Sequence, residues 1–212
     1  MLLAAGRGER MRPLTDQTPK PLLTVRGKPL IVYHLERLAR CGVREVVINL
    51  AWLGERIRSA LGDGSAFGLS ILYSEEGAQA LETGGGIFQA LPLLGDAPFL
   101  VINADVFTDF DFASLGIADD AWAQLVLVPN PPQHPDGDFA LEQDRISEQG
   151  LPRWTYSGIG MYRAALFHGC EPGRFPLRPL LQRAMAGQRL RGQIYRGAWN
   201  DVGTVQRLAA LQ

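Results

Sequence analysis

The sequence predicts an α/β fold in which a mainly parallel sheet carries helices on both faces, giving three layers. Apolar runs alternate with helical patterns throughout the first half of the chain. Each run is almost entirely apolar, which is typical of strands buried on both faces of a parallel sheet. After about residue 129 the pattern changes to short strands and loops. We therefore expect a small α+β subdomain after the parallel sheet.

The first half contains five expected strands and three expected helices. The strands cover residues 2–5, 46–48, 69–73, 99–102 and 125–128. The first helix has Pro29 in its opening turn and ends before Gly42, positions that suit these residue types. Apolar residues at helical spacing indicate a second helix at 53–61. The third starts at the glycine run 84–86 and continues through residue 91.

The second half is expected to pack on the edge of the sheet. Its expected elements are one helix and three short strands, which cover about 177–186, 139–142, 155–162 and 194–196. Neither a low-complexity linker nor an internal repeat separates the two halves. We therefore interpret residues 1–212 as one domain with two lobes, 1–128 and 129–212.

The composition excludes several classes of partner. The 212 residues carry a formal net charge of −1, so no general basic surface predicts binding to nucleic acid or to an anionic membrane. No apolar run is long enough to span a bilayer. Cys41 and Cys170 lie far apart without a CxxC pattern, which favours a reducing compartment. Met1 leads directly into the first strand and leaves no room for a signal peptide, so we expect a cytoplasmic protein. Whether a few residues precede Met1 is left open.

A glycine-rich loop follows the first strand directly. Gly6 and Gly8 allow a sharp turn that presents successive backbone N–H groups to an anion, and Arg7, Arg10 and Arg12 add three cations. Methionine stands where a dinucleotide-binding GxGxxG fingerprint needs its third glycine, and no P-loop pattern is present. The loop is therefore predicted to bind several phosphates. The alternative is a tight strand-to-helix turn with a solvated basic rim.

Lys20 lies close behind this loop, between Pro19 and Pro21. A proline on each side restricts the backbone of the lysine, which suggests a fixed direction for its side chain. A lysine on a surface loop is ordinarily solvated. One that is stiffened in this way beside an arginine-rich glycine loop indicates a functional role.

Residues 3–22 resemble the signature of the nucleotide-sugar pyrophosphorylases, LAAGxGxRMxPLT followed by PKPL, and match every fixed position. The resemblance implies the nucleotide-diphospho-sugar transferase fold, with a nucleotide-binding lobe over 1–128 and a sugar-binding lobe over 129–212. It implies a reaction that joins a nucleoside monophosphate to a sugar 1-phosphate and releases pyrophosphate. It assigns Arg10 to the β- and γ-phosphates and Lys20 to the phosphates around the reacting centre. The first-strand and loop residues that it assigns to the nucleotide are Leu3, Ala4, Ala5, Gly6, Arg7, Gly8 and Arg10.

Two aspartates are candidate metal ligands. Asp105 follows the fourth expected strand, at the carboxyl edge where open α/β sheets bind ligands, and Asp201 lies much later in the chain. Mg²⁺ is commonly held by one or two carboxylates together with substrate phosphates and water. Taken singly, Asp105 could cap a loop, and Asp201 could be a turn residue before a helix capped by Thr204. The resemblance assigns both aspartates to Mg²⁺, although the family more often has glycine where Ala104 stands.

The resemblance also suggests a base pocket and a sugar pocket. Glu82, Thr83 and Gly84 stand where the family recognises the base, and a carboxylate beside backbone N–H groups suits uracil. The alternative is that Thr83 caps a helix and the glycines only allow close packing. Sugar binding is assigned to four residues that could equally be ordinary residues of strand ends: Asn103, Asp138, Ser157 and Gly158. The three histidines are left out of the mechanism.

The chain is most similar to the short uridylyltransferases of this family, through its compact length and residues 51–54, 81–86 and 91–99. The substrate pair implied is UTP with N-acetylmuramic acid α-1-phosphate, in peptidoglycan recycling, with a monomer or small homo-oligomer as the enzyme. Arg153 and Arg163 are the nearest cations for the extra carboxylate of this sugar, or ordinary surface arginines. Uridylyl, thymidylyl or guanylyl transfer to glucose- or mannose-1-phosphate is an alternative. A non-catalytic nucleotide-sugar sensor is an alternative from another class.

Overall fold

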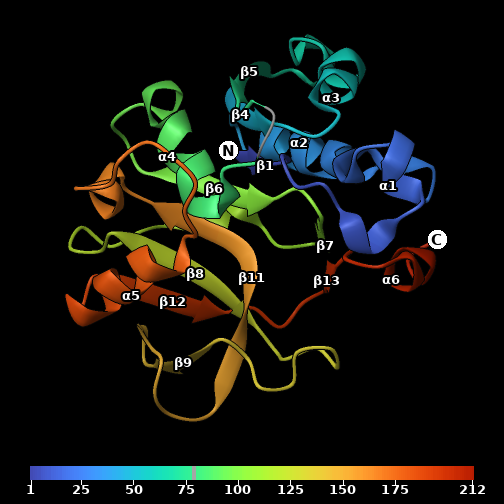
Figure 1. The fold of residues 1–212 in the computed structure, drawn as a ribbon. Coiled ribbons are helices and arrows are strands. Elements are labelled where there is room, and N and C mark those ends of the chain that lie inside the picture. The colour runs from blue at the N-terminus through green and yellow to red at the C-terminus, as the bar shows by residue number, and fades with distance from the viewer. Residues whose placement is uncertain (78–79) are drawn as a thin grey trace.

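A nine-stranded sheet forms the centre of the computed structural model, which describes residues 1–77 and 80–212 (Figure 1). The strand order is β5-β4-β1-β6-β11-β8-β12-β10-β9. The strands are β1 Leu2–Leu3, β4 Glu45–Leu50, β5 Ser70–Glu75, β6 Phe99–Asn103, β8 Ala123–Val128, β9 Phe139–Glu142, β10 Arg145–Ser147, β11 Arg153–Tyr162 and β12 Leu190–Ile194. The first four in the order run parallel to one another, as the apolar runs of the first half predict.

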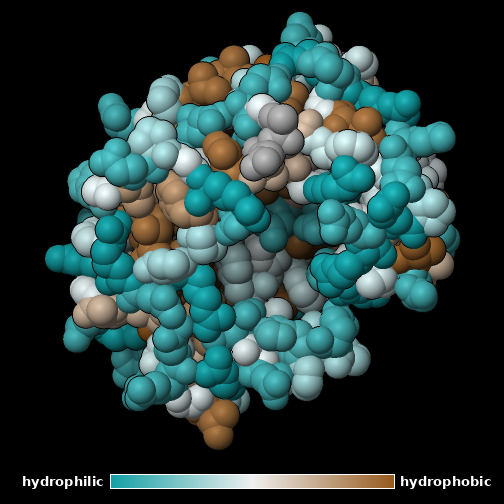
Figure 2. Space-filling model, in the orientation of Figure 1, coloured by the Kyte–Doolittle hydropathy of each residue, from teal (hydrophilic) through white to brown (hydrophobic). Residues whose placement is uncertain are grey.

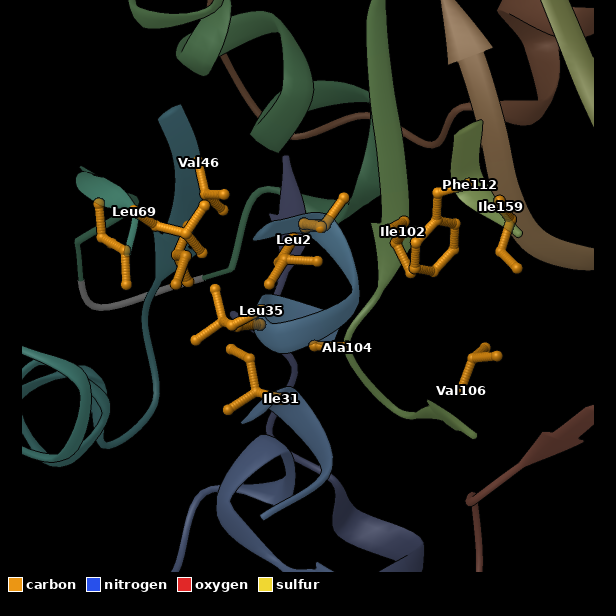
Figure 3. Packing of buried hydrophobic residues seen from close by; sticks show 14 of the residues in the cluster. Leu2, Ile31, Leu35, Val46, Leu69, Ile102, Ala104, Val106, Phe112 and Ile159 are labelled. Carbon is orange, nitrogen blue, oxygen red and sulfur yellow. The ribbon is translucent and has the colours of Figure 1, made fainter. Parts of the chain in front are cut away.

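Helices cover both faces of the sheet, which confirms the three-layer prediction. They are α2 Leu30–Arg40 and α3 Gly54–Leu61 on one face, and α4 Glu82–Leu94 and α5 Arg178–Ala186 on the other. Successive side chains of a strand point to opposite faces. Accordingly, Val46 and Ile48 of β4 join the apolar cluster of α2 and α3, whereas Val47 joins that of α4 and α5. Figure 3 shows part of the first cluster, in which Leu2 of β1 lies beside Leu35 of α2.

The second half lies at the edge of the sheet with β12, β10 and β9, but the prediction is wrong for β11. Its long strand β11 lies between β6 and β8 and runs antiparallel to both, which makes the sheet mixed. β12 then pairs in parallel with β8. Apolar patterns identify strands without identifying their neighbours. The apolar patterns therefore could not predict that β11 lies between β6 and β8.

The last strand predicted from the sequence, 194–196, lies too late in the chain. The corresponding strand β12 begins at Leu190 and ends at Ile194. Arg191, the second residue of β12, is buried and forms ion pairs with Asp120 at 2.6 Å and with Asp144 at 3.3 Å. A charged residue thus interrupts the apolar pattern that indicates a strand, although its partners allow it to be buried.

The C-terminal segment returns to the neighbourhood of the glycine loop. β13 (Trp199–Asp201) pairs antiparallel with β7 (Val106–Thr108), and α6 (Val205–Ala209) follows. The Thr204 hydroxyl accepts a hydrogen bond from the Arg207 backbone N–H at 3.3 Å, which confirms the expected helix cap. Leu208 packs in a small cluster with Met11, a residue of the glycine-loop segment. This packing holds the C-terminal segment against residues near the start of the chain.

Short elements connect the glycine loop to α2. They are α1 Leu14–Gln17 and the two-stranded hairpin of β2 Thr24–Val25 and β3 Lys28–Pro29. Within the described part of the chain, every helix lacks the length or the apolar character needed to cross a membrane.

Candidate functional site

Three adjoining hollows meet at Asp105, just beyond the carboxyl end of β6. The face drawn in Figure 2 is hollowed near its centre. We name the hollows after the elements beside them: the α4 hollow, the β11 hollow and the loop hollow, with volumes of about 240, 280 and 360 Å³. The carboxyl edge of a sheet is where α/β proteins bind ligands. The three hollows together form the candidate site.

The glycine loop lines the loop hollow with Gly6, Gly8 and Arg10. Gly8 has a φ of 68°, and a Cβ on it would lie 3.0 Å from Thr15 Cγ2 and 3.3 Å from Lys20 Cβ. The Thr15 hydroxyl also donates a hydrogen bond to the Gly8 carbonyl at 2.8 Å. Glycine is therefore required here by both backbone conformation and close packing.

Arg7, which was also assigned to the nucleotide, lies over the ring of Trp52 with its guanidinium carbon 3.9 Å from the ring centre. The Trp52 indole donates to the Thr15 carbonyl at 3.1 Å. The cation–π contact fixes Arg7 beside the loop, and its assignment to the phosphates stays a prediction.

Lys20 is buried and reaches the point where the hollows meet. It lines both the α4 hollow and the loop hollow and forms an ion pair with Asp105. Pro19 and Pro21 flank it at the start of a short 3-10 helix, so the backbone holds the side chain in one direction, as expected. The solvated-surface alternative for Lys20 is excluded by its burial.

Strand pairing brings the two candidate metal ligands together. Asp201 of β13 lies opposite Val106, the residue after Asp105, and the Val202 N–H donates to the Asp105 carbonyl at 3.0 Å. The Asp201 carboxylate accepts from the Arg207 guanidinium at 2.8 Å. Both aspartate side chains keep 30% of their surface exposed, so each remains accessible from the hollows.

This pair fits the oxygen-rich coordination of Mg²⁺. In residues 1–77 and 80–212, no group of three or more His, Cys, Asp or Glu side chains gathers as a complete metal site. Two neighbouring carboxylates, Asp105 and Asp201, would instead leave positions for phosphate oxygens and water, as Mg²⁺ sites commonly do.

The loop hollow is also lined by Gly203, which the sequence analysis did not select. A Cβ on Gly203 would lie 3.0 Å from an Asp201 carboxylate oxygen and 3.1 Å from an Arg10 guanidinium nitrogen, and would contact Arg207 as well. Arg10, Asp201 and Arg207 therefore converge around this glycine. In the sequence, the feature that could have identified Gly203 is its position two residues after the candidate metal ligand Asp201.

The α4 hollow contains most of the residues assigned to the base and the first strand. Its lining includes Leu3, Ala4, Ala5, Gly6, Asn49, Glu76, Glu82, Thr83, Asn103 and Asp105. Glu82 has a φ of 61° and forms an ion pair with Arg174 at 2.9 Å. Thr83 lies within α4, which begins at Glu82, so the alternative in which Thr83 caps this helix is wrong. The structure thus places Glu82 and Thr83 together in one hollow.

Gly84 packs against the second lobe. A Cβ on it would lie 2.6 Å from Phe175 Cδ2 and 2.8 Å from the Phe175 carbonyl oxygen. The neighbouring Gly85 N–H donates to that same carbonyl at 3.0 Å. Close packing therefore explains why glycine stands at position 84, and contact between Gly84 and a nucleotide stays a prediction.

A buried polar network beneath the α4 hollow was missed by the sequence analysis. Asn49 accepts a hydrogen bond from the Ala4 N–H at 2.7 Å and donates to Glu76 at 2.6 Å, and Glu76 accepts from the Leu81 N–H at 2.7 Å. Burial raises the pKa of Glu76, while the hydrogen bonds from Leu81 and Asn49 oppose that shift. The network joins the end of β1 to the residue before α4. In the sequence, the feature that could have identified this network is a polar residue near the end of each of the strands β4 and β5.

The β11 hollow collects Asn103, Ser157 and Gly158 of the sugar assignment, together with Tyr156 and His134. Gly158 has a φ of 78°, and a Cβ on it would lie 2.6 Å from the Asn103 amide nitrogen. These residues come from β6, β11 and the loop before β9, which explains why no short motif predicted them all.

Asp138 supports this hollow through its neighbours. Its carboxylate contacts the His134 ring at 3.1 Å and accepts from the Tyr156 N–H at 2.8 Å. Its assignment to direct sugar binding stays a prediction. His134, which the sequence analysis left out, lines the hollow itself.

Arg153 and Arg163 do not serve the β11 hollow as the sequence suggested. Arg153 donates to the carbonyls of Glu148 at 2.6 Å and Asp138 at 2.7 Å, and Arg163 donates to the Ala121 carbonyl at 3.2 Å. Both guanidiniums thus stabilise backbone turns. Neither arginine lines the β11 hollow, which favours the alternative of ordinary arginines over a role with the sugar carboxylate.

Comparison with known proteins gives consistent results. Residues 1–139 match the Nucleotidyl transferase family. The chain is 55% identical to N-acetylmuramate alpha-1-phosphate uridylyltransferase of Neisseria meningitidis, over 100% of this chain and 96% of the relative. It is 36% identical to the Caulobacter vibrioides protein of the same name, over 99% and 94%. A mannose-1-phosphate guanylyltransferase of Mycobacterium tuberculosis is 36% identical over 62% of this chain and 38% of its own length.

Solved structures share the fold at lower identity. A Bacillus anthracis protein in complex with sucrose superposes with a TM-score of 0.84 at 22% identity, covering 99% of this chain and 93% of that one. HddC from Yersinia pseudotuberculosis gives 0.79 at 20% identity, covering 99% and 96%. These similarities confirm the predicted fold class.

Proposed function

We propose, because this chain belongs to the Nucleotidyl transferase family, that it transfers UMP from UTP to N-acetylmuramic acid α-1-phosphate and releases pyrophosphate. The observation that carries the proposal is the meeting of three hollows at Asp105, the ion-pair partner of Lys20. Two substrates and a leaving pyrophosphate need three spaces around one reacting phosphorus. The names and full-length similarity of two relatives support the choice of base and sugar.

In the proposed reaction, a phosphate oxygen of the sugar 1-phosphate attacks the α-phosphorus of UTP in line. The P–O bond to the β-phosphate breaks, and pyrophosphate leaves with that oxygen. The attacking oxygen is already anionic, so no general base is needed. The work of the protein is to position the two substrates and to stabilise the charge that builds up between them.

Each charged residue has a place in this scheme. The N–H groups of the glycine loop and Arg10 bind the leaving pyrophosphate in the loop hollow. Lys20 holds its ammonium where the phosphates of both substrates meet. Asp105 and Asp201 would hold Mg²⁺, which when bound supplies positive charge against the phosphate oxygens. The α4 hollow receives uracil, and the β11 hollow receives the sugar.

Two alternatives make different predictions. An enzyme for glucose- or mannose-1-phosphate would use the same centre with another sugar, as the similarity to a mannose-1-phosphate guanylyltransferase illustrates. A non-catalytic sensor would need the α4 and β11 hollows but would have no use for Lys20, Asp105 and Asp201 together. The convergence of these three residues favours an enzyme.

A single matrix of assays tests the proposal. UTP, dTTP, GTP and ATP are each combined with the α-1-phosphates of N-acetylmuramic acid, N-acetylglucosamine, glucose and mannose, and pyrophosphate release is measured with Mg²⁺ and with EDTA. We expect the fastest release from UTP with N-acetylmuramic acid α-1-phosphate, and loss of release in EDTA. Faster reaction of glucose or mannose would overturn the proposed sugar. If no substrate pair releases pyrophosphate, the non-catalytic sensor is the remaining alternative.

We also propose that the protein acts in the cytoplasm in the reuse of muramic acid from peptidoglycan. The reason is that UTP and sugar phosphates are charged and are retained inside cells. Deletion of its gene should raise the cytoplasmic pool of N-acetylmuramic acid α-1-phosphate, measured by mass spectrometry of cell extracts. An unchanged pool in the deletion strain would contradict this role.

A further inference from the structure

The β11 hollow has few charged groups left for a sugar. Asp105 is paired with Lys20 and Asp201 with Arg207. Arg10 also lines the loop hollow, where the proposed function directs it to phosphates. In the described ranges 1–77 and 80–212, the second lobe contributes one basic side chain to the lining of the β11 hollow, His134. A sugar with a negative charge of its own would meet this side chain.

His134 is held by a chain of hydrogen bonds. Its Nε2 lies 3.1 Å from one carboxylate oxygen of Asp138, and the Tyr156 N–H donates to the other oxygen at 2.8 Å. Arg153 donates to the Asp138 carbonyl at 2.7 Å. A carboxylate oxygen accepts hydrogen bonds, so the His134 ring can donate to Asp138 through Nε2. Among the hydrogen bonds of the described residues, none uses Nδ1 of His134. The ring is fixed at one nitrogen and available at the other.

We infer that His134 determines the preference for a muramic acid substrate by binding its lactyl carboxylate through Nδ1. This inference rests on the proposed function and deepens it. The ring would then contact a carboxylate at each nitrogen, that of Asp138 at Nε2 and that of the substrate at Nδ1. The lactyl group is attached to C3 of the sugar and the phosphate to C1. The carboxylate can therefore reach the second lobe while the phosphate stays near Lys20.

The inference also explains the arrangement around Asp138. Its carboxylate contacts Nε2 of His134 and holds the ring in place, so Asp138 acts as a positioning residue through His134. A sugar without the lactyl ether gains nothing from this arrangement. The preference between the two sugars therefore depends on the lactyl group alone and does not involve the reacting phosphates.

The test compares two sugars that differ in the lactyl ether alone. We would measure kcat/KM of the wild type and of His134→Gln for the α-1-phosphates of N-acetylmuramic acid and N-acetylglucosamine, with saturating UTP and Mg²⁺. Where N-acetylglucosamine α-1-phosphate turns over too slowly, its inhibition constant replaces kcat/KM. Loss of a charge-assisted hydrogen bond predicts a fall of about tenfold or more for the muramic substrate, against about twofold or less for the other.

Two further variants serve as controls. His168→Gln makes the same substitution at an exposed histidine outside the lining of the β11 hollow and should leave the ratio of the two sugars unchanged. His134→Asn can place an amide N–H near the position of Nδ1 and should recover part of the preference lost in His134→Gln. The KM for UTP should stay at the wild-type value in all three variants.

The outcomes separate the inference from the proposed function. If the wild type does not use N-acetylmuramic acid α-1-phosphate, the proposed function and this inference are both overturned. If the wild type prefers that substrate and His134→Gln keeps the same ratio, or loses both sugars equally, the proposed function stands and the role of His134 is overturned. A loss confined to the muramic substrate supports both.

Discussion

Replacing Asp105 with asparagine should separate the two roles of this carboxylate. In the structure, Asp105 is the partner of Lys20, whose side chain is 11% exposed, while the Asp105 side chain is 30% exposed. The variant keeps the shape of the side chain and leaves a nearly buried ammonium without its counter-charge. Removing one partner of a fully buried pair costs about 3–5 kcal/mol, and exposed pairs contribute about 0–1 kcal/mol. For this intermediate pair we expect a loss of about 2 kcal/mol.

The loss of stability should appear as a lower melting temperature. For a chain of this size, about 2 kcal/mol corresponds to a decrease of roughly 4–8 °C. The measurement is calorimetry in EDTA, so that no metal ion contributes to the wild-type value. The double variant Lys20→Met with Asp105→Asn removes both charges and should recover most of the decrease, because no unpaired buried charge remains.

The double variant should recover stability without recovering activity. Pyrophosphate release should fall by about 10²-fold or more in Asp105→Asn, as for loss of a preorganised electrostatic group, and the double variant should stay inactive. Near-wild-type turnover of Asp105→Asn with Mg²⁺ would refute the assignment of Asp105 to the metal. A wild-type melting temperature for the same variant would refute the argument from the buried pair.

Three further predictions concern other parts of the site. Asp201→Asn should also lose about 10²-fold or more of pyrophosphate release, and retained turnover with Mg²⁺ would remove it from the proposed metal site. Gly158→Ala requires a Cβ at a φ of 78° and 2.6 Å from the Asn103 amide, so KM for the sugar phosphate should rise while KM for UTP stays constant; the reverse pattern would contradict the sugar assignment. Burial raises the pKa of Glu76 above its value of about 4.5 in the unfolded chain. Protonated Glu76 therefore contributes its full stabilisation below pH 4.5, and this stabilisation is lost as pH rises through the higher pKa of the folded protein. Urea unfolding from pH 4 to 7 should show this decline in the wild type and less of it in Glu76→Gln, and parallel curves would contradict the shift.

The glycine loop and Lys20 were predictable because their signals are local. Two glycines, three arginines and three prolines lie within about twenty consecutive residues, and each constrains the backbone or the charge of its immediate neighbours. The helix cap of Thr204 was predictable for the same reason, since a cap depends on the next three residues. The structure preserves these features because no distant contact overrides them.

The sugar side was less predictable because its residues take their roles from distant partners. Arg153 looked available by its place beside β11, but carbonyls of the preceding loops occupy its guanidinium. His134 looked irrelevant in a loop, but Asp138 and Tyr156 hold it at the β11 hollow. A sequence records the donor and acceptor capacity of each side chain and does not record which partners fold against it.

The sequence by itself determined the α/β class and the composition of the glycine loop, since hydrophobic periodicity and backbone restriction act over a few neighbouring residues. Only the tertiary structure decided that β11 inserts between β6 and β8, and that β13 pairs with β7 so that Asp201 lies beside Asp105. These two aspartates come from segments far apart in the chain. Their meeting depends on strand register, which is set by the cooperative packing of the whole sheet and by no local pattern.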